Sequence, residues 1–165
     1  MSSVEHTATT VSVSELPTLA GKDLGVSRWV EIPQRDIDAF AELTGDRQWI
    51  HIDPERAKTS PFGSTVAHGF YTLALSTEFV YELLDVHDAT QILNYGLNKV
   101  RFPAPTPAGS RVRMAMRVAD VAPVPGGYQA TYALTFERDG ATKPVCVAEL
   151  VFRYTASDNT RTDAS

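Results

Sequence analysis

Cysteine and long apolar runs are scarce in this sequence. Cys146 is the only cysteine among the 165 residues, so neither an intramolecular disulfide nor a zinc site built on cysteine pairs is expected. It lies in an apolar, strand-like run, where a small buried side chain is far more common than a reactive thiol. No apolar run approaches the roughly 18 to 20 residues that span a bilayer. We therefore expect no membrane partner.

Positive charge is also in the minority. Lys and Arg number 15 against 20 Asp and Glu, which gives a net charge of -5. Without a basic tract that carries interleaved aromatic residues, a nucleic-acid partner is not expected. Binding of phosphate groups must rely on local cations, and for each of these alone a solvated strand face is the commoner role. The candidates are Lys99, Arg101, Arg111 and Arg113.

Neither repeats nor low-complexity linkers divide the chain. Its length and its 43% hydrophobic content fit one compact domain. Residues 1–14 and 156–165 are polar and without periodicity, so we predict a flexible tail at each end and a single domain over residues 15–155. The first 15 residues have neither a charged n-region nor an apolar h-region, which predicts a cytoplasmic protein.

The second half of the chain has the period-two pattern of β-strands. Three runs alternate apolar with polar or small residues, and turn sequences (PVPGG and ERDGATK) separate them. Upstream, QILNYGLNKVRFPAP is a further extended run that prolines stop. Four successive strands predict an antiparallel sheet with one apolar face. That face would hold Val112, Met114, Met116, Val118, Tyr128, Ala130, Tyr132, Leu134, Phe136, Cys146, Ala148, Leu150, Phe152 and Tyr154.

The first half is different in pattern. RWVEI is a candidate short strand, and PQRDIDAFAEL has apolar residues at helical spacing. TVAHGFYTLALSTEFVYELL is the longest candidate helix, with Ser64 or Thr65 available as its N-cap. Val66 to Leu75 includes no charged residue if His68 is neutral, which predicts a buried helix. A buried helix and a long antiparallel sheet pack best if the sheet curls around the helix, an α+β arrangement.

The segment with the strongest chemical signal runs from Thr44 to Gly69. It holds Asp46 and His51, and a bent loop can bring two side chains five residues apart to one point. A carboxylate and an imidazole that share one water molecule form a workable acid–base pair near neutral pH. Spacing alone is weak evidence, because such pairs are common in solvated loops. Asp53, followed by Pro and Glu, is instead typical of a helix N-cap.

Gly69, directly after His68, is the second feature of this segment. A glycine near the start of a buried helix costs about 1 kcal/mol relative to alanine unless something needs close access to the backbone. A backbone N–H at this position could hold a developing oxyanion, since the positive end of the helix dipole lies behind it. A tight contact between helix and sheet explains the glycine equally well.

Three segments, DRQWIHIDPERA, SPFGSTVAHGF and NYGLNKVRFPAPTPAGSRV, together resemble the MaoC-like dehydratases and (R)-specific enoyl-CoA hydratases. The resemblance is to their single-domain, NodN-like bacterial branch. It covers roughly residues 15–155, and the first segment contains the family's hydratase motif. It implies a hot-dog fold, in which a curved antiparallel sheet wraps a long central helix. It also implies a homodimer paired through the sheets, or a higher homo-oligomer.

The resemblance further implies roles for single residues. Asp46 and His51 would hold the water that adds to a trans-2-enoyl-CoA to give a (3R)-3-hydroxyacyl product, or catalyse the reverse reaction. The Gly69 N–H would polarise the thioester carbonyl. Gln48 stands where several relatives have Asn, which leaves its part in substrate binding open. No metal and no cofactor are implied, since coenzyme A is part of the substrate.

Two other functions remain open at this point. One is a dehydratase that acts on acyl-carrier-protein thioesters, which needs a basic surface near the tunnel mouth. The other is a non-catalytic hot-dog subunit that binds acyl thioesters, because a fold alone does not decide a function. The presence of both Asp46 and His51 favours an enzyme. Trp49 and Phe62 flank these residues, either as walls of an acyl tunnel or as core packing.

Overall fold

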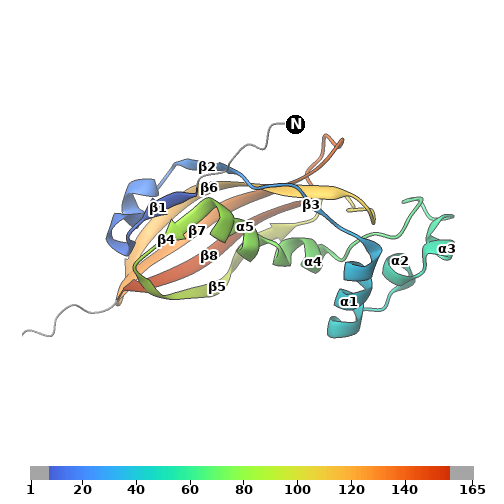
Figure 1. The fold of residues 1–165 in the computed structure, drawn as a ribbon, viewed down its shortest axis with the longest axis horizontal. Helices are drawn as coiled ribbons and strands as arrows, with labels where there is room; N and C mark the ends of the chain where they lie inside the picture. Colours follow the sequence, from blue (N-terminus) through green and yellow to red (C-terminus); the bar gives the residue numbers. More distant parts are fainter. Residues whose placement is uncertain (1–7, 157–165) are drawn as a thin grey trace, which may run out of the picture.

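A six-stranded antiparallel sheet forms the body of the molecule (Figure 1). The computed structural model describes residues 8–156. Five strands follow the order β2-β6-β7-β8-β5, and β3 also pairs with β6. Their bounds are β2 (Asp23–Val26), β3 (Val30–Glu31), β5 (Ala89–Arg101), β6 (Arg111–Val124), β7 (Gly127–Arg138) and β8 (Cys146–Ala156).

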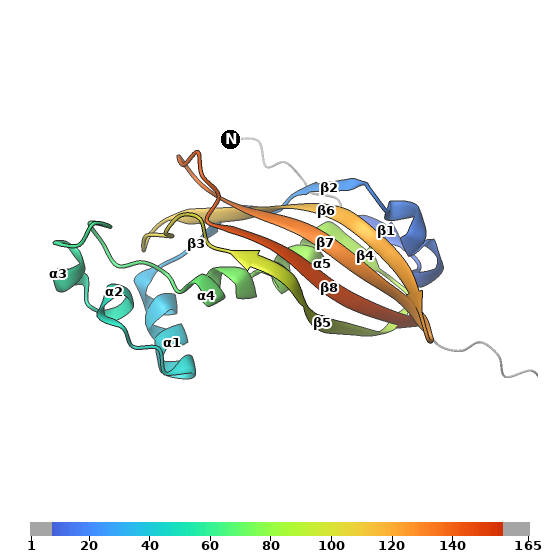
Figure 2. The same cartoon turned by 180° about the vertical axis from the view of Figure 1, so that it is seen from behind.

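The inner face of this sheet is the apolar face that the period of two predicts. Side chains from β6, β7 and β8 are buried there against helix α5 (Ser76–Leu83), with Phe79 and Val80 fully buried. Thirteen of the fourteen side chains assigned to this face are buried, and Tyr128 is partly buried. Figure 2 shows the sheet curving around α5, so the expected α+β architecture is confirmed. Among residues 8–156, no helix is long and apolar enough to cross a membrane.

The prediction of a flexible N-terminal tail is wrong for residues 8–14. Thr9–Val11 form β1, which pairs in parallel with β4 (Leu84–Val86), and the 3-10 helix η1 (Val13–Leu19) follows. Val11 and Val13 are buried in the core, which supplies the stability that holds this segment in place. Residues 1–7 and 157–165 of the two expected tails lie outside the described residues, and Ala156 belongs to β8.

The long helix predicted from Thr65 starts later and is bent. It begins at Gly69 with His68 as its N-cap, and it consists of α4 (Gly69–Ala74) and α5. Ser64 and Thr65 are therefore not its N-cap. Instead Val66 and Ala67 donate backbone hydrogen bonds to Ile50 and Thr106, which holds this stretch extended. The helix is not buried all round, since Phe70 is 71% exposed on its outer side.

Residues 34–68, here called the overhang, lie beyond one end of the sheet (Figures 1 and 2). They contain α1 (Gln34–Thr44), α2 (Trp49–Ile52) and α3 (Pro54–Ala57). The predicted helix over PQRDIDAFAEL is thus α1, and the predicted N-cap Asp53 accepts a hydrogen bond from the Arg56 N–H across 3.0 Å. The overhang contains all residues from Asp46 to His68, and α4 starts directly after it at Gly69.

Candidate active site

Gly45 turns the chain from α1 into the candidate site. Its backbone has a φ of +80°, a left-handed conformation that glycine adopts without steric cost, and its N–H donates to the Ala41 carbonyl. This ends α1 and places Asp46 immediately after the turn. The Asp46 side chain is 52% exposed, and its Oδ1 lies 3.4 Å from the Gln48 N–H nitrogen. The carboxylate is therefore open to an incoming substrate.

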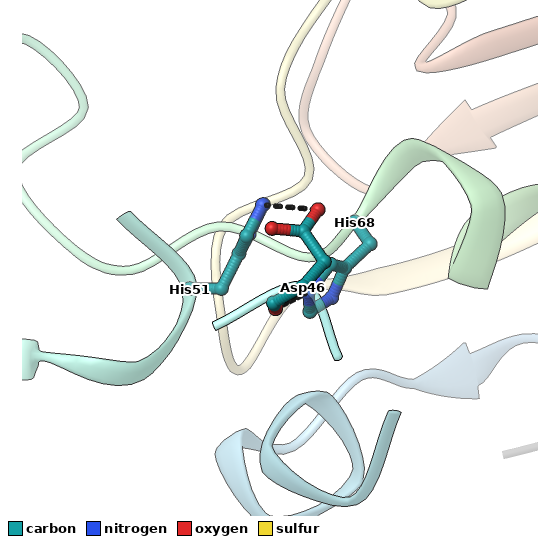
Figure 3. Close-up of side chains that lie close together, drawn as sticks. All are labelled: Asp46, His51 and His68. Atoms are coloured by element: carbon teal, nitrogen blue, oxygen red, sulfur yellow. Dashed lines mark hydrogen bonds and ion pairs between the residues drawn. The ribbon is translucent and has the colours of Figure 1, made fainter. Parts of the chain in front are cut away.

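His51 lies opposite Asp46 on the short helix α2, so this part of the segment is partly helical (Figure 3). Its Nε2 is 3.9 Å from Oδ2 of Asp46, and its residue is 7% exposed. The ring Nδ1 lies 2.6 Å from the carbonyl oxygen of Val66, which can only accept a hydrogen bond. Nδ1 therefore carries the proton, and in the neutral ring Nε2 is the free acceptor that faces Asp46.

Burial shapes the acid–base character of His51. Desolvation lowers the pKa of His51 below its ordinary value, and the neighbouring His68 acts in the same direction. The hydrogen bond to Val66 and the charge of Asp46 act against this and raise the pKa, but burial dominates. The imidazole is thus kept neutral, as a proton acceptor must be, close to physiological pH.

His68 is a member of the cluster that the sequence did not single out as a site residue. Its ring stacks on that of His51 with centroids 3.7 Å apart, and its Nε2 lies 2.8 Å from the Asp46 carbonyl oxygen. The residue is 3% exposed. A histidine inside an otherwise uncharged apolar run was the available signal. Figure 3 shows the three side chains of the cluster gathered between α2 and α4.

One ligand atom from each of the three residues lies within 4.8 Å of the others, but the geometry of the two rings disfavours a shared metal ion. Lone pairs of imidazole nitrogens lie in the ring plane. The two rings are stacked only 23° from parallel, so their lone pairs do not converge on one ion. His51 Nδ1 and His68 Nε2 contact carbonyl oxygens, which leaves only His51 Nε2 and His68 Nδ1 as possible ring ligands.

Gly69, the first residue of α4, lies where the helix meets the end of β5. A Cβ built on it would come within 2.9 Å of the Phe102 ring, so close packing by itself requires glycine here. Its N–H has no acceptor within the helix, because the first N–H groups of a helix have none. A cavity of about 290 Å³ adjoins it, lined by residues that include Gly69, Thr72, Phe102 and Thr106.

The structure also places the other residues predicted to flank the site or to bind substrate. Phe62 lines the same cavity, as expected of a tunnel wall, whereas Trp49 lies under the Arg56 guanidinium at 4.2 Å. Gln48 is exposed beside Asp46, and its backbone N–H rather than its side-chain amide contacts the carboxylate.

Three of the four candidate phosphate-binding cations form ion pairs with acidic residues: Lys99 with Glu149, Arg111 with Asp139 and Arg113 with Glu137. Arg101, next to Phe102, donates to its own neighbour's carbonyl.

Comparison with known proteins adds independent information. The MaoC like domain family matches residues 15–135. A protein of Mycobacterium tuberculosis named 3-hydroxyacyl-thioester dehydratase Z is 50% identical over 146 residues, which cover 88% of this chain and 97% of that protein. Nodulation protein N of Rhizobium meliloti is 38% identical over 144 residues, 86% of this chain and 89% of that protein. The R-hydratase PhaJ1 of Pseudomonas aeruginosa superposes with a TM-score of 0.70 at 23% identity, over 88% of this chain and 86% of that chain.

Proposed function

Since this chain belongs to the MaoC-like domain family, we propose that it is a hydro-lyase that adds water to trans-2-enoyl-CoA, or removes it from the (3R)-3-hydroxyacyl thioester. The observation that carries the proposal is the Asp46–His51 pair at 3.9 Å. A cavity is lined by Ala67 and Gly69, the chain neighbours of His68, whose ring stacks on His51. The relative that is 50% identical and named a dehydratase supports the same reaction. The expected hot-dog fold agrees with the R-hydratase neighbour.

The geometry suits a shared water molecule. A separation of 3.9 Å is too long for a direct hydrogen bond, yet one water can donate to both Oδ2 of Asp46 and Nε2 of His51. With both hydrogens of the water so engaged, a lone pair on its oxygen is directed away from the pair. An enoyl thioester bound with C3 toward that lone pair would have the orientation that the addition needs.

The proposed addition balances without any further reactant. The water oxygen forms a bond to C3 while the Asp46–His51 pair accepts the proton that leaves the water. The π electrons move toward the thioester carbonyl, whose developing negative charge the Gly69 N–H would stabilise. A proton then returns from the pair to C2. No redox change occurs, so we propose no cofactor beyond the coenzyme A of the substrate.

The partner we propose is a second copy of this chain. β5 is an edge strand that pairs only with β8 within residues 8–156, and it exposes Leu93, Tyr95 and Leu97 by 43 to 53%. Phe70 of α4 extends this apolar surface. An exposed apolar edge of this length is a template for pairing with a like strand. A homodimer across β5 would cover it.

Coenzyme A is the favoured thioester carrier. Arg101 is an exposed cation directly before the cavity residue Phe102 in the chain, and a single local cation suits a small anionic ligand. An acidic carrier protein would need a wide basic surface, whereas Lys99, Arg111 and Arg113 are paired with acids. Comparing kcat/KM on crotonyl-CoA and on the same acyl group carried by an acyl carrier protein separates the two.

The test of the reaction itself is loss of the enoyl-thioester absorbance with crotonyl-CoA, followed by chiral analysis of the product. We expect the 3R product, and a fall in kcat of at least about 100-fold in Asp46→Asn and in His51→Gln. Asp53→Asn, which keeps the cap of α3, is the matched control in the same segment and should keep full activity. Full activity in both site variants would exclude the proposed chemistry.

A further inference from the structure

We propose that His68 is a positioning residue for the Asp46–His51 pair, which it holds by one hydrogen bond and one ring stack. This inference rests on the proposed function, because it concerns the same site. No part of the reaction requires His68 to touch the substrate. Its task is to fix the carboxylate and the imidazole relative to each other.

The hydrogen bond reaches the main chain of Asp46. His68 Nε2 lies 2.8 Å from the Asp46 carbonyl oxygen, which can only accept, so Nε2 carries the proton. Asp46 lies in a loop directly after α1 and is itself half exposed. Its backbone is thereby tied to a side chain at the N-terminus of α4, which is 3% exposed.

The stack reaches the other partner of the pair. The rings of His68 and His51 have centroids 3.7 Å apart and planes 23° apart. Phe40 of α1 packs against His68 at 5.0 Å and against Tyr71 at 5.6 Å. His68 therefore contacts rings from both α1 and α2, the two helices between which Asp46 lies. A displacement of His68 would move one or both of the pair.

A purely packing residue would be expected to be apolar here. With its proton on Nε2, neutral His68 has a bare Nδ1, and this buried atom has no hydrogen-bond partner within residues 8–156. An unpaired buried acceptor costs stability that Phe or Leu would not cost. The imidazole is thus explained by what its Nε2–H and its ring do for the catalytic residues.

Electrostatics gives the stack a second effect. Two imidazolium rings at 3.7 Å would repel strongly, so the stack disfavours a state in which both rings are positively charged. The charged or titratable groups around His68 are His51 on α2, Asp46 after α1, and Tyr71 on α4 with Asp36 behind it. The stack thus helps to keep His51 as the neutral acceptor that the addition of water requires.

The experiment uses the full chain with three substitutions. His68→Phe keeps a ring and removes the Nε2–H, while His68→Gln keeps an amide N–H and removes the ring. Val80→Ala, fully buried in α5 and remote from the cluster, is the control for lost stability alone. For each we would measure kcat and KM on crotonyl-CoA across pH, and the tautomer and pKa of His51 by ¹⁵N NMR.

We expect His68→Phe to lower kcat about 10- to 100-fold through misplacement of the pair. KM should stay within about twofold, because only positioning is lost. The acid limb of the pH profile should move to higher pH, and His51 should titrate higher by NMR. Val80→Ala should change none of these. His68→Gln should fall between wild type and His68→Phe, and it decides the question if the Phe variant does not fold.

Unchanged kcat and an unchanged acid limb in folded His68→Phe or His68→Gln would overturn the positioning role. The ¹⁵N NMR measurement of His51 distinguishes failure of this positioning role from failure of the proposed reaction. If the wild type does not hydrate crotonyl-CoA, the reaction assignment fails for that substrate. The His51 tautomer and pKa in the two His68 variants then still decide whether His68 positions and tunes His51.

Discussion

His51 Nδ1 donates to the main-chain carbonyl oxygen of Val66 across 2.6 Å, which makes the backbone, not a carboxylate, the group that sets the tautomer of this histidine. Val66 is in turn fixed by its pairing with Pro107 and by its N–H bond to Ile50. The free nitrogen that faces Asp46 is therefore determined by how residues 65–67 pair with residues 106–108.

Activity should persist into mildly acidic solution. The proposed hydration requires neutral His51, and burial lowers the pKa of His51 from its ordinary value near 6.5. The neutral form thus survives as pH falls below that value, and the acid limb of log(kcat/KM) for crotonyl-CoA should lie below pH 6.5. Stopped-flow measurement of the profile checks this. An acid limb above pH 6.5 would contradict the assignment of that limb to His51.

Gly69→Ala should destabilise the protein through Phe102. The added Cβ would lie 2.9 Å from the ring, and such overpacking costs about 1 to 3 kcal/mol. Shortening the neighbour in Gly69→Ala/Phe102→Leu should restore the free energy of unfolding, as urea denaturation would show. The alanine keeps its N–H, so activity should return with stability. A stable but inactive double variant would instead mean that substrate needs the space at Gly69.

The buried tyrosine pair should behave as one unit. The hydroxyls of Tyr132 and Tyr154 lie 2.7 Å apart, and both residues are at most 1% exposed. Removing one hydroxyl leaves the other without this partner and should cost about 1 to 3 kcal/mol of unfolding free energy. Tyr132→Phe/Tyr154→Phe should cost less than the sum of the single changes. Additive losses in thermal or urea unfolding would show that the hydroxyls are not coupled.

Leu97→Asp should convert the proposed dimer to a monomer. Leu97 is 43% exposed on edge strand β5, and a charge there opposes pairing with a second apolar edge. Sedimentation of both proteins at equal concentration measures the change, and Leu43→Asp, on the exposed end of α1, is the control. A wild type that sediments as a monomer at micromolar concentration would refute the homodimer.

The strands were predictable because burial repeats along them with the period of the pleat. Met114 and Met116 of β6 are buried in the core, and Ala115 between them is only partly buried, as alternation in the sequence requires. The same logic failed at Val66. Apolar character alone could not tell a helix start from a segment held extended by Thr106 and Ile50, since those partners lie elsewhere in the chain.

The candidate site was predictable in part. Asp46 and His51 were indicated by residue type, spacing and resemblance, and the structure brings their side chains to 3.9 Å. His68 has no comparable signal in the sequence, where it is a single histidine within an apolar run. Its stack on His51 depends on the turn at Gly45 and on the packing of α1 against α4, neither of which leaves a periodic signal. Long-range contacts of this kind are outside the reach of local patterns.

The position of the overhang has a consequence for how this protein loses activity. Asp46, His51 and the segment that orients them lie outside the sheet that holds most of the buried apolar surface. Segments with few buried contacts open locally at a lower free energy than the core. Warming would then abolish activity through local unfolding of the overhang while the sheet is still folded, and cooling would restore the activity. Amide hydrogen exchange in residues 46–68 would report that reversible inactivation directly.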